Sequence, residues 1–109
     1  MGESRLVDPL GEEIVLHDRT WFGHIVKRRA ELRPYRQTVE DIVRSPMVVL
    51  RSDEAGGRPR GRVYLGRCPD RKLLIKVCVE EITVAGRPEL IVKTAYLCRT
   101  AGPGEQLWP

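Results

Sequence analysis

The sequence predicts an α+β domain in which two N-terminal helices pack on one face of a four-stranded antiparallel sheet, preceded by a small N-terminal β-hairpin. Two observations lead to this class. Apolar residues recur at helical spacing between positions 18 and 45, and after Pro46 they alternate in four extended runs separated by turn residues. The chain of 109 residues suits one domain, which we assign to residues 1–99, with a loosely ordered tail at 100–109.

The predicted hairpin joins two short extended segments, residues 5–7 and 13–17. Between them, Asp8-Pro9 followed by Gly11 is typical of a tight turn. Asp18 or Thr20 then offers a side-chain oxygen to cap the first helix.

This first helix should end near Leu32, because Pro34 disfavours helical geometry in the residue before it. Arg29 falls in the middle of its apolar face, where a cation must meet a carboxylate, reach water at the rim or serve a ligand. The face is formed by five further apolar side chains: Trp21, Phe22, Ile25, Val26 and Leu32.

A second helix is predicted to begin at Thr38-Val39-Glu40-Asp41, which resembles a capping box, and it should end at Ser45-Pro46. Its expected buried face consists of Val39, Ile42 and Val43. Four strands are then predicted at residues 47–51, 62–67, 72–81 and 90–99, with a polar turn over 52–59 between the first two.

One face of the predicted sheet, with Ile75, Val77 and Val79, should be covered by the helices. The other face is left open, and it would carry Lys76 together with Arg62 and Tyr64 as a platform for an anionic ligand or a partner. Strict alternation allows two arrangements on the last strand, because Lys93 and Thr94 must point to opposite faces. Either Lys93 lies on the open face, or Thr94 and Tyr96 do.

The net charge of +4 comes with fifteen arginines against four lysines. Guanidinium groups suit phosphates and carboxylates, so this balance favours an anionic partner such as RNA or an acidic protein, although compositional bias alone could produce it. The three cysteines form no metal-binding pattern and are expected to be reduced thiols, so no metal and no cofactor is predicted. With no apolar run long enough for a membrane span or a signal peptide, a cytoplasmic location is expected.

Motifs of the large enzyme classes, such as a P-loop, GxSxG, HExxH or a dinucleotide fingerprint, are absent from the sequence. The remaining polar residues include histidine, arginine, lysine, threonine and tyrosine. Such a set can cleave RNA without a metal ion, because the 2′-hydroxyl of RNA supplies the nucleophile while a histidine moves protons and cations stabilise the phosphorane.

Three segments carry a family resemblance. The helix His24-Ile25-Val26-Lys27-Arg28-Arg29-Ala30-Glu31 resembles the His-Ile-x-x-Arg-His-Pro-Glu helix of phage-associated nucleases of the barnase, EndoU, colicin and RelE-like superfamily. Ser45-Pro46-Met47-Val48-Val49 is similar to that family's proline and strand, and the segment ending in Thr94-Ala95-Tyr96 to its last strand. The resemblance spans roughly residues 6–99 and implies two helices on a sheet with metal-independent RNase or toxin activity.

The resemblance also implies site residues. His24 and Arg28 match the first histidine and the arginine of the helix motif, while Thr94 and Tyr96 match the last strand. Arg29 stands where the family has its second histidine, so this arginine either stabilises the transition state beside His24 or marks the loss of catalysis. We take His24, Arg28, Arg29, Thr94 and Tyr96 as the catalytic candidates, and the substrate-binding candidates are Lys76, Lys93, Arg62 and His17.

The predicted function is therefore that of a metal-independent endoribonuclease or RNase-type toxin that acts through 2′-hydroxyl attack. A toxin of this kind implies a neutralising antitoxin or immunity protein. The alternative is a catalytically inactive module that binds nucleic acid or protein in a phage or mobile-element system. A homodimer formed across the open sheet face, without a ligand, is a third interpretation.

Overall fold

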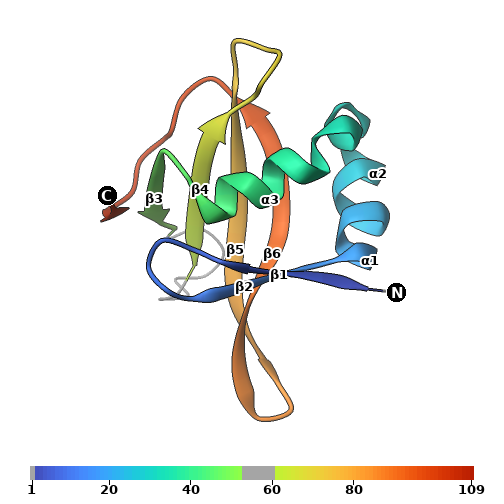
Figure 1. Ribbon diagram of the computed structural model, residues 1–109, viewed down its shortest axis with the longest axis vertical. Helices are drawn as coiled ribbons and strands as arrows, with labels where there is room; N and C mark the ends of the chain where they lie inside the picture. Colours follow the sequence, from blue (N-terminus) through green and yellow to red (C-terminus); the bar gives the residue numbers. More distant parts are fainter. Residues whose placement is uncertain (1, 53–60) are drawn as a thin grey trace.

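A computed structural model describes residues 2–52 and 61–109 of the chain, and its centre is one curved mixed sheet (Figure 1). The strands run in the order β1-β2-β6-β5-β4-β3-β7. Their bounds are β1 Glu3–Val7, β2 Glu13–His17, β3 Val48–Arg51, β4 Arg62–Arg67, β5 Leu74–Val84, β6 Arg87–Cys98 and β7 Gln106–Trp108. The polar turn predicted at 52–59 lies outside the described residues from position 53 onward.

The α+β class is confirmed, but the expected four-stranded antiparallel sheet is wrong because the sheet has seven strands of mixed direction. The meander from β3 to β6 is antiparallel, as predicted, and so is the N-terminal hairpin. The hairpin joins the sheet when β2 pairs in parallel with β6 at Ile14–Leu90 and Val15–Ile91. This pairing uses backbone groups at strand edges, which leave no side-chain pattern in the sequence.

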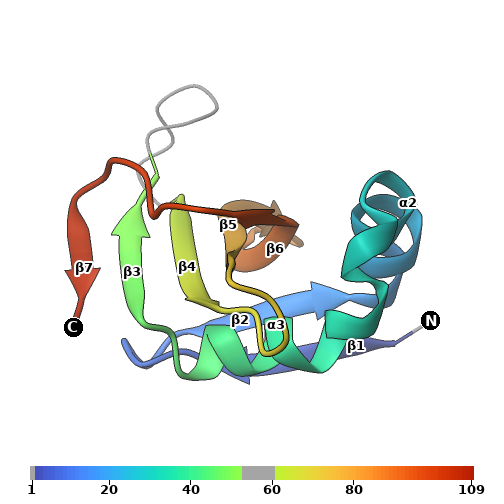
Figure 2. The ribbon, with the colours of Figure 1, turned by 90° about the horizontal axis from the view of Figure 1, so that it is seen from above.

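The C-terminal residues differ from the loosely ordered tail that was expected. The chain after β6 crosses the sheet face opposite α3 and reaches the outer side of β3 (Figure 2). There β7 pairs antiparallel with β3, with Val49 opposite Trp108. Leu107 and Trp108 pack against the main core, so apolar burial as well as backbone pairing holds the end of the chain.

The first helical region is broken into short pieces, and the predicted continuous helix to Leu32 is wrong. Its bounds are α1 Asp18–Thr20, the π-helical turn η1 Trp21–Ile25, α2 Val26–Arg28 and the 3₁₀ helix η2 Ala30–Tyr35. The helix stops at Arg29, whose φ of −133° and ψ of 77° are not helical. Pro34 sits inside η2, just ahead of the next helix, where a fixed φ and a missing N–H are tolerated.

No helix among residues 2–52 and 61–109 is long and apolar enough to cross a membrane.

The predicted helix caps also differ. Asp18 begins α1 without capping it, and its carboxylate instead accepts hydrogen bonds from the Gly2 N–H at 3.1 Å and from Arg36 at 2.7 Å. The second helix, α3 (Arg36–Arg44), begins ahead of Thr38, which therefore lies within the helix and not at its cap. These contacts tie the N-terminus, α1 and α3 together.

The core lies between α3 and the face of the sheet that was expected to be covered. Val39, Ile42 and Val43 of α3 are buried, as predicted, and they join the alternating residues of β5 in one cluster. Trp21 and Ile25 from η1 belong to the same cluster. Three residues of β5 complete this contact: Ile75, Val77 and Val79.

Gly66 of β4 lies directly beneath α3, and we expect Gly66→Ala to destabilise the fold by about 1–3 kcal/mol. A Cβ at this position would clash with Cγ1 of Ile42 and lie 3.2 Å from its Cγ2. Both atoms branch from the Cβ of Ile42, so a rotamer change cannot move both away. Urea denaturation measures the effect. Gly23→Ala is the matched control, because nothing lies within 4 Å of the place that its added Cβ would occupy; equal losses of stability for the two variants would refute the close contact.

Candidate functional site: a cation and tyrosine cluster

Four of the candidate side chains meet on the face of the sheet opposite α3, and we call Arg29, Lys76, Thr94 and Tyr96 the Arg29 cluster. Nη1 of Arg29 donates a hydrogen bond to Oγ1 of Thr94 at 3.1 Å. Its Cζ lies 5.1 Å from the centroid of the Tyr96 ring, and Nζ of Lys76 lies 5.6 Å from the same centroid. Both distances are within the range of cation–π attraction.

The helix break at Arg29 makes this arrangement reachable. The helical region stands beside β6 (Figure 1), and α2 ends one residue before Arg29. Since the backbone leaves the helix there, the side chain is not held on the apolar face as the continuous helix predicted. It lies half-buried against β6, with its guanidinium on Thr94 and Tyr96.

Strand register places the other three residues side by side. Lys76 of β5 is opposite Tyr96 of β6, and Cys78 is opposite Thr94. The register then shifts, so that Val79 is opposite Val92 and Lys93 is the extra residue of a β-bulge.

This bulge resolves the two arrangements that alternation had left open. Val92 and Ala95, three residues apart, are both buried in the main core. Lys93 and Thr94 between them are both on the opposite face, where Nζ of Lys93 approaches Oε2 of Glu80 at 3.8 Å and Thr94 meets Arg29. The expectation that Lys93 and Thr94 must point to opposite faces is therefore wrong.

Charge is unbalanced at the Arg29 cluster. Within residues 2–52 and 61–109, neither Arg29 nor Lys76 has a carboxylate within 4.0 Å, the limit for an ion pair. Lys93, by contrast, has Glu80 beside it. Two neighbouring cations without a counter-ion, beside a hydroxyl and an aromatic ring, form a setting that an anion would stabilise.

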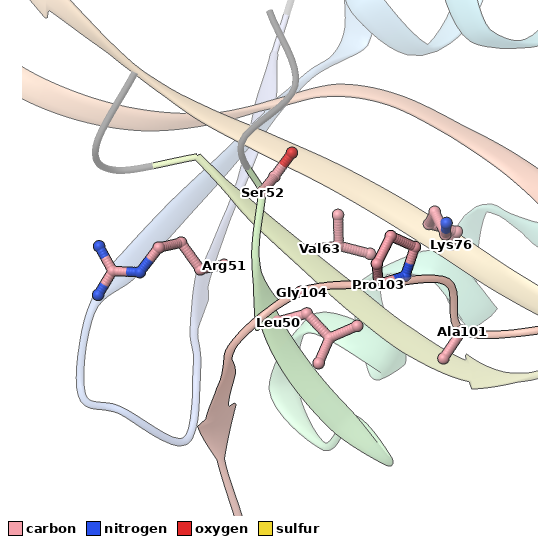
Figure 3. A pocket seen from close by; sticks show the side chains of 8 residues that line it. All are labelled: Leu50, Arg51, Ser52, Val63, Lys76, Ala101, Pro103 and Gly104. Carbon is pink, nitrogen blue, oxygen red and sulfur yellow. The ribbon is translucent and has the colours of Figure 1, made fainter. Parts of the chain in front are cut away.

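A cavity of about 300 Å³ adjoins this cluster on the side of Lys76 (Figure 3). The C-terminal segment crosses the cavity and contributes Ala101, Pro103 and Gly104 to its lining. Leu50 and Val63, from the sheet, form its apolar wall. Burial raises the pKa of the nearby Cys98 thiol, and the positive charge of Lys76 lowers it in part. Lys76 therefore stands between an apolar-walled cavity and the ring of Tyr96.

His24 and Arg28 lie in the neighbouring helical turns. His24 is the fourth residue of η1 and is half-buried, while Arg28 is exposed at the end of α2. In the part of the chain that the structure describes, neither side chain forms a hydrogen bond or an ion pair. The structure thus brings Arg29, Thr94 and Tyr96 together and leaves His24 and Arg28 without a direct bond to them.

His17 lies apart from the cluster, at the end of β2. Its Nδ1 is 3.8 Å from Oε1 of Glu3, and its Nε2 is 3.5 Å from Oε1 of Glu89. Two carboxylates beside the imidazole would repel a phosphate, so this environment does not suit the substrate-binding role expected of His17.

The prediction that Arg62 and Tyr64 lie on the open face is wrong, because alternation along β4 turns both toward the hairpin. Arg62 forms ion pairs with Asp8 at 3.2 Å and with Glu12 at 2.7 Å, and the Tyr64 hydroxyl donates to Asp8 at 2.5 Å. Burial, and then the hydrogen bond to Asp8, raises the pKa of Tyr64. Burial lowers the pKa of Arg62, but its hydrogen bonds to Glu12 and Tyr64 outweigh this and raise it. This network could not be predicted from the sequence because Asp8 and Glu12 lie fifty or more positions before Arg62 and Tyr64, with no local signal.

No three histidine, cysteine or acidic side chains in the described ranges lie close enough together to hold a metal ion. Comparison with known proteins finds no matching family model, no matching curated protein and no matching solved structure.

Proposed function

We propose that the protein binds RNA at the Arg29 cluster and cleaves it by attack of the 2′-hydroxyl, without needing a metal ion. The observation that carries the proposal is a pair of cations, Arg29 and Lys76, which both lie close to the Tyr96 ring and have no carboxylate partner in the described residues. Arginine and lysine bind phosphate, and an aromatic ring offers a stacking surface for an unpaired base. RNA supplies both groups.

Each residue of the cluster has a role in this proposal. The guanidinium of Arg29 and the ammonium of Lys76 contact the scissile phosphate and stabilise the charge that develops on it. Thr94 accepts a hydrogen bond from Arg29 and so fixes the direction of its remaining N–H groups. Tyr96 stacks with a base next to that phosphate, and the apolar-walled cavity beside Lys76 offers room for a neighbouring base.

The reaction requires a group that moves protons near neutral pH. Arginine stays protonated and cannot act as a base, so we assign this role to His24. His24 takes the proton from the 2′-hydroxyl as its oxygen bonds to phosphorus. The bond from phosphorus to the 5′-oxygen breaks, and the leaving 5′-oxygen takes a proton from water. The products are a 2′,3′-cyclic phosphate and a 5′-hydroxyl end.

RNA binding without cleavage is the second candidate, and one observation favours it. The imidazole of His24 makes no hydrogen bond with the Arg29 cluster in the described part of the chain, so the cluster can act as a binding site on its own. In the toxin form of the first proposal, an antitoxin or immunity protein would place carboxylates against Arg29 and Lys76.

Incubating single-stranded RNA with the protein in EDTA tests the proposal. We expect fragments with 2′,3′-cyclic ends and a rate that falls about 10²–10⁴-fold in His24→Ala, the usual contribution of general acid–base catalysis. His17→Ala is the matched control and should keep the wild-type rate. An unchanged rate in His24→Ala would overturn the role of His24, and RNA that is bound but stays intact would favour the second candidate.

A further inference from the structure

A second group of cations lines a cavity of about 490 Å³ at the end of the sheet where β4 turns into β5 and where β6 ends. Four positively charged side chains contribute to it: Arg67, Arg71, Lys72 and Arg99. Its remaining lining residues are Cys68, Pro69, Leu73 and Leu74, so no carboxylate lines it. In residues 2–52 and 61–109, none of the four cations is within 4.0 Å of a carboxylate.

The one acidic residue of this turn is engaged elsewhere. The Tyr35 hydroxyl donates a hydrogen bond to Oδ1 of Asp70 at 2.5 Å, and the Cys68 thiol contacts the same oxygen at 3.4 Å. These bonds hold the pKa of Asp70 below its usual value, and the charge of Arg71 adds to the effect. The bond to Asp70 correspondingly raises the pKa of Tyr35 to about 12.

The turn is also fixed in shape. The backbone N–H of Cys68 donates to the carbonyl of Leu73 at 2.9 Å, which closes the loop. Tyr35 is buried in the core at the end of η2, and its hydrogen bond to Asp70 anchors the turn to the core. The cations are therefore presented by a braced turn whose carboxylate is hydrogen-bonded to Tyr35 and Cys68 and, in the described residues, forms no ion pair with them, which leaves most of their charge for an outside anion.

Leu74, one of the residues that line this cavity, lies on the same face of the sheet as the Arg29 cluster. Lys76 pairs with Tyr96, and the next pair on that face is Leu74 with Cys98, about 7 Å along the strands. Leu74 lines the cavity, and Arg99 follows Cys98. One short strand of nucleotides can thus touch both places.

We infer that the cavity lined by Arg67, Arg71, Lys72 and Arg99 is a second phosphate-binding subsite, which holds the backbone of a single-stranded RNA whose neighbouring phosphate lies at the Arg29 cluster. The inference rests on the proposed function and extends it: the substrate is a single strand several nucleotides long. A dinucleotide is long enough to occupy the Arg29 cluster but does not reach the cavity.

The test compares the salt dependence of binding for two probes that cannot be cleaved, a 2′-O-methyl dinucleotide and a 2′-O-methyl octanucleotide. The variant is the double substitution Arg71→Gln and Lys72→Gln. Its matched control is Arg19→Gln with Arg87→Gln, which removes the same charge from exposed positions on α1 and at the start of β6. Fluorescence anisotropy at several salt concentrations gives the slope of log affinity against log salt.

For the octanucleotide, the cavity variant should show a slope smaller by about 0.7 for each phosphate that the protein no longer neutralises, hence about 1.4 for the pair. Its binding of the dinucleotide should match that of the wild type, and the control variant should match the wild type with both probes. If the octanucleotide binds but the cavity variant behaves like the control, the subsite is refuted and the proposed function stands. If the wild type binds neither probe, both fail.

Discussion

Replacing Arg62 by leucine should lower the free energy of unfolding by about 3–5 kcal/mol, because it would leave Asp8 as an unpaired carboxylate inside the fold. The Asp8 side chain is 0% exposed and that of Arg62 is 10% exposed. Asp8 also accepts hydrogen bonds from the backbone N–H groups of Leu10 and Glu12, so it closes the hairpin turn while Arg62 anchors that turn under β4. Chemical denaturation followed by circular dichroism measures the loss.

Arg51→Leu is the matched control for that experiment. Arg51 is also a strand arginine with a carboxylate partner, Glu105 at 2.8 Å, but the two side chains are 41% and 66% exposed. Water and salt screen such a pair, so we expect a loss of less than about 1 kcal/mol. Similar losses for the two variants would contradict the structural role given to the buried network.

Replacing Arg29 by glutamine should reduce RNA cleavage by about 10²–10³-fold, the usual effect of removing one donor to a developing oxyanion. Glutamine can still donate a hydrogen bond to Thr94, but it removes the charge that the proposal places on the phosphate. The free energy of unfolding should change little, because Arg29 is only half-buried and has no ion pair in the described residues. Initial rates on a fluorescent RNA measure the effect.

Lys27→Gln is the control for Arg29→Gln, since it removes one exposed positive charge from the same helical region. It should retain the wild-type rate within a small factor. Equal losses in the two variants would show that only net charge attracts the RNA, and Arg29 would have no specific role. If RNA is bound and not cleaved, the same pair of variants is compared by affinity, with the same order expected.

Local sequence patterns predicted much of the fold. The turn at Asp8-Pro9 indicated the hairpin, and alternation after Pro46 indicated the four central strands in their antiparallel order. The patterns could not predict the parallel pairing of β2 with β6 or the return of β7 to β3, since both depend on strand edges brought together by the whole chain. The end of α2 at Arg28 was also missed, because neither Gly nor Pro marks it.

The candidate site was predictable only in part. The resemblance of the helix and the last strand to a nuclease family suggested Arg29, Thr94 and Tyr96 as candidates, and the structure brings these three together with Lys76. Alternation already puts Thr94 and Tyr96 on one face, whereas the β-bulge that brings Lys93 to the same face could not be predicted from it.

The face of the sheet on which the Arg62 side chain lies was predicted wrongly for a different reason. Strand β4 has side chains that pack on both faces, Val63 and Leu65 in one cluster and Tyr64 in the other. Its alternation therefore does not show which side is the core. Asp8 pairs with Arg62 and so holds its side chain on the core side, but it lies 54 positions away in the sequence.

Binding of RNA at the Arg29 cluster can be tested by titrating the isotopically labelled protein with the uncleavable dinucleotide and following the amide chemical shifts. We expect the largest shifts at Arg29, Lys76, Thr94 and Tyr96. Shifts confined to α3 or to the hairpin of β1 and β2, or no shifts at all at low salt, would contradict it.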